Sequence, residues 1–347
     1  MKQSPQSLTE NRSLESQDVK RIDVVCAADD AYVMPLAVTL KSACRHLAAG
    51  IQIRLFLLTG EIADENWSLL EQTLAGEPIE IHPITPDLDT VSDLSISHHI
   101  SHTAYFRLLS AELVPSDVTK AIYLDCDLFI KQDITSLWDL PVEQHYCLAT
   151  ADAACPFIDA ENYRLANPYM AALRPIPNYR PLGLDGAAEY FNSGVMVLNI
   201  QRWREENVAE RLLKILRDNR NYVWCWDQYA LNVLCHGQWG RFEPRWNQGA
   251  HVFEYPTAAH APIDRQQWIE MKTNPAIVHF TTEFKPWQAG SNHPRSEVFY
   301  EGLADTAWHD WQPPKPNPSF QHWFNRRMVN VIKKSTITSR KIASVWA

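Results

Sequence analysis

Two aspartates one residue apart, Asp125 and Asp127, follow a short apolar stretch in the run AIYLDCDLFIK of residues 121–131. Residues 121–124 have the character of a buried parallel strand, and open α/β sheets bind ligands just beyond the carboxyl ends of their strands. In an extended segment, residues i and i+2 point the same way, so both carboxylates can converge on one cation. Hard oxygen ligands suit Mg²⁺ or Mn²⁺. The pair predicts a divalent metal site, with two solvated turn acids as the alternative.

Apolar runs of strand length alternate with amphipathic segments along the chain. We expect strands at residues 22–27, 51–58, 79–84, 121–124, 146–150, 194–199 and 276–280, and helices at 32–46, 64–74, 208–217 and 227–234. This alternation is typical of βαβ units. Five prolines among polar and aromatic residues interrupt it at 152–190. We expect an irregular excursion over the sheet edge there, which would form an acceptor-side wall or lid.

Length and composition favour one large α/β domain, because the chain has 347 residues, of which 46% are hydrophobic and 21% are charged. Residues 1–20 are polar and lack the apolar core of a secretory signal, so we expect a disordered segment and a cytoplasmic protein. The seven cysteines form no Cys-x-x-Cys pair. This indicates reduced thiols rather than a disulfide framework or a zinc site. No stretch approaches the roughly 18 apolar residues of a membrane span.

The net charge of −9 is unevenly distributed, because no acid follows Asp310 and seven bases there give +7, which leaves −16 for residues 1–310. We expect the folded domain to cover residues 21–311 and a Pro-rich linker and basic tail to cover 312–347. Aromatic and aliphatic residues alternate with the bases between 320 and 346. That pattern is typical of an amphipathic element on an anionic membrane surface, where each base contributes about 1 kcal/mol. The alternative is a helix packed on the main domain. We expect no nucleic acid partner, because the rest of the chain is acidic.

Five separated motifs give the chain a resemblance to a known family. They are VVCAADDAY (24–32), TAYFRLL (103–109), YLDCDLFIKQDITSLWDL (123–140), YFNSGVMVLNIQRW (190–203) with WDQYALN (226–232), and VHFTTEFKPW (278–287). In this order they resemble the retaining glycosyltransferases of family 8, which include bacterial lipopolysaccharide galactosyl- and glucosyltransferases and glycogenin. The resemblance covers roughly residues 22–287. It implies a GT-A fold, an α/β architecture with a Rossmann-like, nucleotide-sugar-binding mixed sheet flanked by helices.

The resemblance also implies a metal centre and a donor. Asp125 and Asp127 would hold Mn²⁺, with Mg²⁺ as the alternative, and His279 would be the third protein ligand rather than a structural histidine. The metal would bridge the diphosphate of UDP-galactose or UDP-glucose. Lys285 would contact that diphosphate as a point charge, the alternative being an ordinary surface lysine.

Other residues of the motifs would surround the donor. The resemblance assigns donor binding to Ala27, Ala28, Asp29, Tyr32, His99, Arg107, Cys126, Asn192 and Ser193. The uracil and ribose would lie at the end of the first strand, where Asp29 accepts hydrogen bonds and Tyr32 stacks near the base. Asp29 or Asp30 could instead cap the next helix. His99 belongs to the group His98, His99 and His102, for which a second metal is the less favoured interpretation.

Asp227 and Gln228 are the expected catalytic residues. The resemblance puts Asp227 on the hydroxyls of the donor sugar, although it could instead be a helix N-cap. Gln228 would face the β side of the anomeric carbon. An amide is a poor nucleophile, so we favour displacement on one face, in which the leaving phosphate deprotonates the acceptor, over a covalent intermediate.

At Thr282 the family usually has glycine, so a side chain there would alter the loop or weaken donor binding.

The sequence therefore predicts a retaining, metal-dependent enzyme that transfers galactose or glucose to a sugar hydroxyl of a lipid-linked or surface glycan, of the lipopolysaccharide type. It would lie on the cytoplasmic face of the membrane, attached through its tail. The alternative is a degenerate, membrane-docked nucleotide-sugar-binding protein without turnover. A dehalogenase-type phosphatase is disfavoured, because Phe129 stands where that class needs Thr or Val. A nucleotidyltransferase is disfavoured because no Gly-rich loop follows the first strand.

Overall fold

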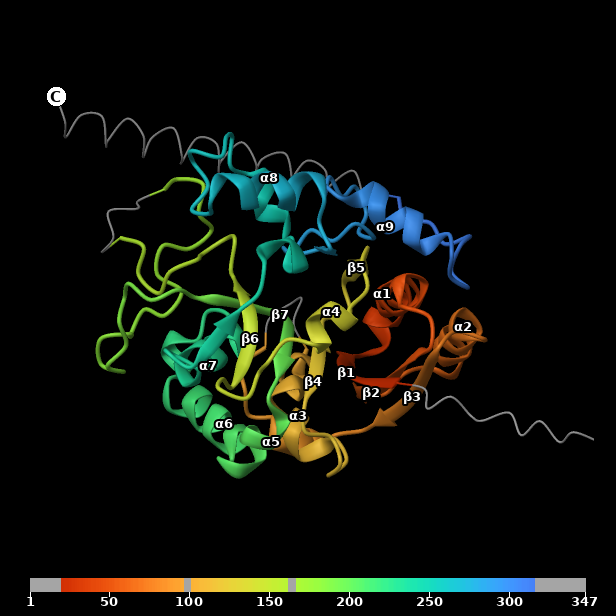
Figure 1. Ribbon diagram of the computed structural model, residues 1–347, viewed down its shortest axis with the longest axis horizontal. Helices are drawn as coiled ribbons and strands as arrows, with labels where there is room; N and C mark the ends of the chain where they lie inside the picture. The colour runs from red at the N-terminus through yellow and green to blue at the C-terminus, as the bar shows by residue number, and fades with distance from the viewer. Residues whose placement is uncertain (1–19, 97–100, 162–166, 316–347) are drawn as a thin grey trace, which may run out of the picture.

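A seven-stranded mixed sheet with the strand order β3-β2-β1-β4-β7-β6-β8 forms the centre of the molecule (Figure 1). The structure is a computed structural model that describes residues 20–96, 101–161 and 167–315. The strands of this sheet are β1 (Lys20–Ala28), β2 (Ile51–Thr59), β3 (Ile79–Ile84), β4 (Ala121–Leu124), β6 (Cys147–Ala151), β7 (Phe191–Leu198) and β8 (Trp239–Arg241). A second sheet contains only β5 (Leu128–Ile130) and β9 (Ile277–His279).

The first half of the main sheet is parallel. β1 pairs with β2 from Lys20↔Ile51 to Ala28↔Thr59, and β2 pairs with β3. The crossovers are the helices α1 (Val33–His46), which follows the 3₁₀ turn η1 (Asp30–Tyr32), and α2 (Asp64–Leu74). Parallel strands need such crossovers, and the later residues of β1 and β2 are buried, whereas β3 at the edge of the sheet is only partly buried.

The second half of the main sheet is largely antiparallel, because β7 lies antiparallel to both β4 and β6. The helices that accompany it are η3 (His102–Leu109, a 3₁₀ helix), α3 (Ser110–Leu113), α4 (Thr135–Trp138), α5 (Ile200–Glu205), α6 (Val208–Asp218) and α7 (Trp226–Leu234). The remaining helices are α8 (Arg265–Thr273), α9 (Ser296–Leu303) and the short 3₁₀ turns η2 (Leu88–Thr90), η4 (Arg220–Tyr222), η5 (Pro244–Asn247) and η6 (Ala250–Phe253). α8 and α9 run along the top of the view in Figure 1.

Two apolar clusters lie on opposite faces of the sheet. In β1 and β4 alternate side chains point to opposite faces, so Val25 and Tyr123 belong to one cluster and Val24 and Ile122 to the other. The first cluster packs on η3, α6 and α7, and the second packs on α1 and α9. The switch from parallel to antiparallel strands falls at the β4–β7 pair, where the chain leaves β4 with the acidic residues.

The small β5–β9 sheet brings together two residues of the site. Asp127 directly precedes β5, and His279 is the last residue of β9. Its register is antiparallel, with Leu128 opposite His279. The Thr39 side chain of α1 fixes β5 in place, because its hydroxyl accepts from the Leu128 N–H at 2.9 Å and donates to the Leu128 carbonyl at 3.0 Å. β5 is therefore attached to a long core helix.

Most of the expected elements are confirmed. The helix at 64–74 and the strands at 79–84 and 121–124 have the expected bounds, and the helix at 208–217 ends one residue later. β7 begins at residue 191 rather than 194. The strand expected at 276–280 is present as β9, but it joins the small sheet rather than the main one.

Other expectations meet the structure only in part. β1 begins at Lys20, whereas the first strand was expected to begin at residue 22. The described residues of 152–190 carry no helix and no strand before β7 except an isolated bridge between Phe157 and Glu189. All seven cysteines are free thiols, as expected. Within the described ranges no helix has both the length and the apolar character to cross a bilayer. Residues 316–347 and 1–19 lie outside the described part.

Candidate active site

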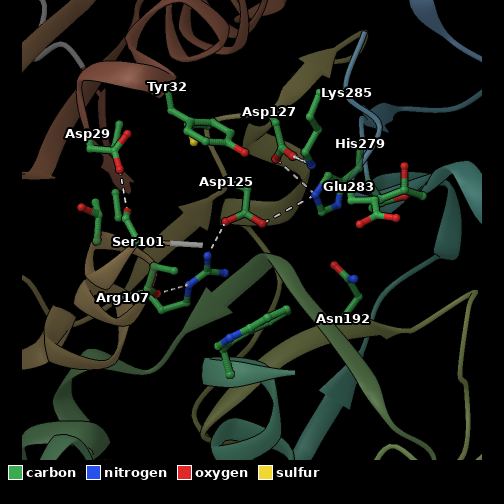
Figure 2. A pocket seen from close by; sticks show the side chains of 18 residues that line it. Asp29, Tyr32, Ser101, Arg107, Asp125, Asp127, Asn192, His279, Glu283 and Lys285 are labelled. Carbon is green, nitrogen blue, oxygen red and sulfur yellow. Dashed lines mark hydrogen bonds and ion pairs between the residues drawn. The ribbon is translucent and has the colours of Figure 1, made fainter. Parts of the chain in front are cut away.

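Asp125, Asp127 and His279 lie together at the carboxyl end of β4 (Figure 2). One side-chain ligand atom from each lies within 4.8 Å of the others. His279 Nε2 is 3.2 Å from Asp127 Oδ1 and 3.6 Å from Asp125 Oδ2. The backbone holds this arrangement, because the Asp125 N–H donates to the Gly194 carbonyl at 2.8 Å. The expected convergence of the two aspartates is therefore present, with His279 beside them.

The chemistry of these three side chains suits a divalent cation. Two carboxylates and one imidazole nitrogen form a mixed oxygen and nitrogen donor set, which favours Mn²⁺ over Ca²⁺. Asp127 and His279 are buried, with exposed fractions of 6% and 5%. Buried carboxylates need a counter-charge, and a divalent cation at this position would supply one.

Lys285 lies on the other side of Asp127. Its ammonium group is 2.5 Å from Asp127 Oδ2 and donates to the Phe280 carbonyl at 2.8 Å. Burial alone would raise the pKa of Asp127, but Lys285 and His279 outweigh burial and hold this pKa below its usual value. Asp127 is therefore ionised at neutral pH.

Arg107 of η3 connects two carboxylates. Its guanidinium lies 2.7 Å from Asp125 Oδ1 and 3.2 Å from Asp227 Oδ2, and its central carbon lies 4.6 Å from the centre of the Tyr123 ring. Arg107 is only 8% exposed. Burial raises the pKa of Asp227 even though Arg107 opposes the shift. Arg107 is expected to contact the phosphate or the sugar of the donor. In the structure it is the counter-charge of two aspartates.

A cavity of about 320 Å³ contains most of the expected site residues. Those that line it are Ala27, Ala28, Asp29, Tyr32, Arg107, Asp125, Cys126, Asp127, Asn192, His279, Thr282 and Lys285. They come from β1, η1, η3, the end of β4, β7 and the segment after β9, so segments distant in the sequence meet at one place. The volume falls at the lower end of the range of small-molecule sites.

Asp29 and Tyr32 form one end of this cavity. Asp29 precedes η1 but makes no side-chain cap to it, and its carboxylate instead accepts a hydrogen bond from Ser101 Oγ at 2.5 Å. Asp29 thus stands at the N-cap position of η1, but its side chain does not cap the turn. Asp30 accepts from the Ala63 N–H at 2.9 Å, next to the start of α2. The Tyr32 ring meets Trp287 edge-on, with 5.9 Å between the ring centres.

Three expected residues lie outside the cavity lining, namely Ser193, Asp227 and Gln228. Ser193 joins the other two, because its hydroxyl donates to Asp227 Oδ2 at 3.1 Å and its N–H donates to Gln228 Oε1 at 3.1 Å. Asp227 is the second residue of α7 and not its cap, so the N-cap alternative is wrong. Trp226, the first residue of α7, lines the cavity itself. His99 lies outside the described residues.

Several residues of the site were not predicted. Asp152 accepts hydrogen bonds from Asn192 Nδ2 at 2.9 Å and from Gln228 Nε2 at 3.0 Å. Asn247 contacts His279, and Ser101, Trp226 and Glu283 line the cavity. Gly194 had a usable signal, because a glycine between Ser193 and a β-branched run in a strand often marks a close approach. Asp152 and Asn247 had no such local signal.

Thr282 has a positive φ of 81° and lines the cavity. A β-branched residue rarely adopts this left-handed conformation, since its Cβ clashes with the backbone. The expected departure from glycine at this position is thus accompanied by backbone strain.

Residues 23–290 match the model of glycosyl transferase family 8. General stress protein A of Bacillus subtilis (strain 168) is 27% identical over 297 residues, which cover 85% of this chain and 97% of that protein. The lipopolysaccharide 1,2-glucosyltransferase of Escherichia coli (strain K12) is 25% identical over 245 residues, which cover 71% of this chain and 66% of that enzyme. The chain spans about three fifths of the length of other curated glycosyltransferases that it matches.

The fold also has counterparts among solved structures. The galactosyltransferase LgtC, solved in complex with donor and acceptor sugar analogs, superimposes with a TM-score of 0.68 at 23% identity. The match covers 82% of this chain and 96% of LgtC. At that identity the likeness establishes the architecture, which is the GT-A fold of a mixed sheet flanked by helices in one domain.

Proposed function

This chain belongs to glycosyl transferase family 8, and on that premise we propose that it transfers galactose or glucose from a UDP-sugar to a glycan hydroxyl with retention of configuration and with Mn²⁺. The observation that carries the proposal is the group Asp125, Asp127 and His279 in the wall of a cavity of about 320 Å³. A cation held there faces the space in which a nucleotide diphosphate would lie. Lys285, on the same wall, supplies a second positive charge.

The nucleoside is proposed to occupy the end of the cavity formed by the end of β1 and η1. Ala27 and Ala28 have small side chains there, which leaves space beside the backbone. Asp29 would bind the ribose or the base in place of its present partner Ser101, and Tyr32 would pack near the base. Cys126 lies between the two acids and faces the same cavity. The shared cavity supports this proposal, because one extended ligand would contact all these residues.

The donor sugar is proposed to lie toward Asn192, Ser193, Asp227 and Gln228. Asp227 is buried and its Oδ2 accepts from the Ser193 hydroxyl at 3.1 Å, so its carboxylate would be held in place to accept hydrogen bonds from hydroxyls of the sugar. The Gln228 carbonyl already accepts from the Ser193 N–H at 3.1 Å, which orients the amide. Trp226 lines the cavity, whereas Asp227 and Gln228, which follow it in α7, do not, so we expect the Trp226 side chain to move when the sugar binds.

The proposed chemistry is displacement on one face of the sugar. The Gln228 amide dipole would stabilise positive charge at the anomeric carbon, and a phosphate oxygen of the leaving group would take the acceptor proton. When bound, the divalent cation would neutralise the negative charge that develops on the departing diphosphate. Arg107 is paired with both Asp125 and Asp227 and would help to keep the two carboxylates in place.

The acceptor is proposed to be a lipid-linked or surface glycan of the lipopolysaccharide type, on the cytoplasmic face of the membrane. The similarity to a lipopolysaccharide glucosyltransferase and the basic, aromatic sequence of 320–346 support this. Removal of residues 320–347 should abolish co-sedimentation with anionic liposomes and leave hydrolysis of the donor largely intact. Loss of both properties, or of neither, would contradict the membrane proposal.

The decisive experiment measures UDP release from a panel of UDP-sugars, with and without Mn²⁺, for the intact protein and Asp127→Ala. We expect Mn²⁺-dependent release from UDP-galactose or UDP-glucose, lost in Asp127→Ala. The control is Asp218→Ala, which removes an exposed carboxylate that pairs with Lys214 and should change nothing. A donor that binds with Mn²⁺ but never turns over, even with glycan acceptors, would favour the degenerate binding protein. No binding of any UDP-sugar would reject the proposed function.

A further inference from the structure

We infer that Asn247 is a positioning residue that fixes the tautomer of His279 and couples the metal-binding group to the amide of Asn192. The inference rests on the proposed function only for the identity of the metal. Asn247 ends η5, is 5% exposed and does not line the cavity. Its Oδ1 lies 2.8 Å from His279 Nδ1, and its Nδ2 lies 2.8 Å from Asn192 Oδ1.

The orientation of the Asn192 amide follows from two neighbours whose roles are fixed. The Gly194 N–H can only donate, and it lies 2.9 Å from one amide atom of Asn192, which must therefore be the oxygen. The other amide atom lies 2.9 Å from Asp152 Oδ2. Asp152 Oδ2 is an acceptor here, because it also accepts from Gln228 Nε2 at 3.0 Å, and the Gln228 amide is oriented by the Ser193 N–H that donates to its Oε1. Asn192 thus presents its oxygen to Asn247.

The orientation of Asn247 follows from that of Asn192. The atom of Asn247 that faces Asn192 Oδ1 has to be a donor, so it is Nδ2. The carbonyl oxygen of Asn247 then faces His279, and a carbonyl has no hydrogen to give. His279 must therefore carry a proton on Nδ1, and Nε2 is the ring nitrogen that faces Asp125 and Asp127. With a metal ion on Nε2 in place of any proton there, the ring would have the tautomer that a metal ligand requires.

The backbone keeps Asn247 and His279 in register. The Gln248 N–H donates to the Ile277 carbonyl at 3.0 Å, and the His279 N–H donates to the Gln248 carbonyl at 2.9 Å. The two side chains are therefore carried by segments that are joined immediately beside them. Asn247 cannot shift without moving the backbone next to the imidazole.

The hydrogen bond from Asn247 to Asn192 links His279 to the side of the site where the donor sugar is proposed to lie. Asn192 lines the cavity, and Asp152 accepts from both Asn192 and Gln228. A change at Asn247 should consequently reach Gln228 through a chain of hydrogen bonds between buried or half-buried groups. The structure therefore contains a continuous polar connection between the metal-binding imidazole and the proposed sugar-binding side.

Two substitutions of Asn247 test separately its hydrogen bond to His279 and its hydrogen bond to Asn192. In Asn247→Asp the carboxylate still accepts from His279 Nδ1–H, but it faces Asn192 Oδ1 with an oxygen instead of a donor. We expect the Kd for Mn²⁺, measured by calorimetry without donor, to stay within about threefold of the wild-type value, and kcat to fall at least tenfold. In Asn247→Leu both bonds are lost, and we expect Mn²⁺ affinity to fall about 10- to 100-fold.

Asn178 provides a matched control. It is also buried, its Oδ1 accepts from the Tyr229 hydroxyl at 2.8 Å, and its Nδ2 donates to Asn219 Oδ1 at 2.7 Å. It does not line the cavity. Asn178→Asp and Asn178→Leu should therefore lose hydrogen bonds comparable to those lost in the Asn247 variants. They should leave the Mn²⁺ affinity unchanged. An equal loss of affinity in the Asn178 variants would show that the effect at Asn247 is general and would overturn the inference.

The ¹⁵N NMR spectrum of the histidine side chains tests the inference in the metal-free protein and without measuring turnover. The His279 signal is assigned by comparison with His279→Gln. We expect a protonated Nδ1 in the metal-free wild-type protein and in Asn247→Asp, and mixed tautomers in Asn247→Leu. A wild-type His279 without a proton on Nδ1 would overturn the inference. If the wild-type protein bound no Mn²⁺, the proposed function would fail, and the tautomer would still decide the role of Asn247. If Asn247→Leu did not fold, Asn247→Asp and the wild-type tautomer would remain decisive.

Discussion

The backbone of Gly194 in β7 lies directly against the imidazole of His279 in β9. A Cβ atom on Gly194 would clash with the ring and would lie 2.8 Å from Asp125 Oδ2. The proposed metal-binding group, Asp125, Asp127 and His279, therefore depends on the absence of a side chain at residue 194. We predict that Gly194→Ala lowers the affinity for Mn²⁺ at least tenfold, because the added methyl group must displace His279 or Asp125. Calorimetric titration with Mn²⁺ measures this directly.

Gly240 is the control for that substitution, because it also lies in a strand and a Cβ there would press on Leu148 and His145. Gly240→Ala should destabilise the fold and leave the Mn²⁺ affinity of the folded protein unchanged. Wild-type affinity in Gly194→Ala would show that the imidazole is free to move.

The pair formed by Lys285 and Asp127 leads to a second prediction. The Lys285 ammonium competes with a cation for the same carboxylate, at a distance of 2.5 Å. In Lys285→Met we expect Mn²⁺ alone to bind at least as tightly as in the wild type, and UDP in the presence of Mn²⁺ to bind about tenfold more weakly, because a charge near the diphosphate is lost. Titrations with and without UDP separate the two effects. Lys272→Met, remote from the cavity, should alter neither, and weaker binding of Mn²⁺ alone in Lys285→Met would contradict the competition.

The strained backbone at Thr282 predicts a stabilising substitution. Relief of the positive φ of 81° in Thr282→Gly should exceed the entropic cost of glycine and raise the free energy of unfolding by about 1 kcal/mol. Urea unfolding measures the change. Asn207→Gly, at φ 48°, should give a smaller gain, because asparagine tolerates this region well. A loss of stability in Thr282→Gly would mean that the hydrogen bond from the Phe284 N–H to Thr282 Oγ1, at 3.3 Å, outweighs the strain.

His293 gives the folded protein a pH dependence. Burial, assisted by the charge of Lys285, lowers the pKa of this histidine from 6.5 to about 4. The unfolded chain thus binds one more proton between these values, so the stabilising effect of the neutral ring is complete above pH 6.5 and is lost as the pH falls toward 4. The contribution to unfolding free energy should fall by about 2 kcal/mol between pH 7 and pH 5.

Urea unfolding of His293→Gln at both pH values checks the effect of His293. The variant should lose less stability than the wild type on this change of pH, while His309→Gln, at a largely exposed ring, should behave as the wild type does. Equal pH dependence in His293→Gln and the wild type would show that His293 is not the titrating group.

The sequence predicts the parts of the site that depend on local geometry. Asp125 and Asp127 are recognisable because an i, i+2 spacing in an extended segment points two carboxylates the same way. His279 and Lys285 were assigned through a motif that fixes their distance from each other along the chain. Asp152 and Asn247 were missed, because their roles come from contacts with residues 40 and 32 positions away. No local pattern encodes such contacts.

The wrong alternatives have similar causes. Asp227 looked like a cap because it precedes an apolar helical run, but α7 begins one residue earlier with Trp226 at a positive φ of 43°. The strand predicted at 276–280 has the apolar character of a core strand, and β9 is found within those residues. Its partner could not be predicted, because β5 and β9 are only three residues long and pair across about 150 positions of the chain.

The short β5–β9 ladder also determines which changes of chain length the protein can tolerate. Leu128 is opposite His279, and one ligand precedes the first strand while the other ends the second. Insertion or deletion of a single residue in either strand would turn its side chains to the other face and separate Asp127 from His279. Changes of length between residues 254 and 264, where the chain has no helix or strand, would leave this pairing intact. Variation in loop length can therefore accumulate around the metal-binding group but not within the ladder that forms it.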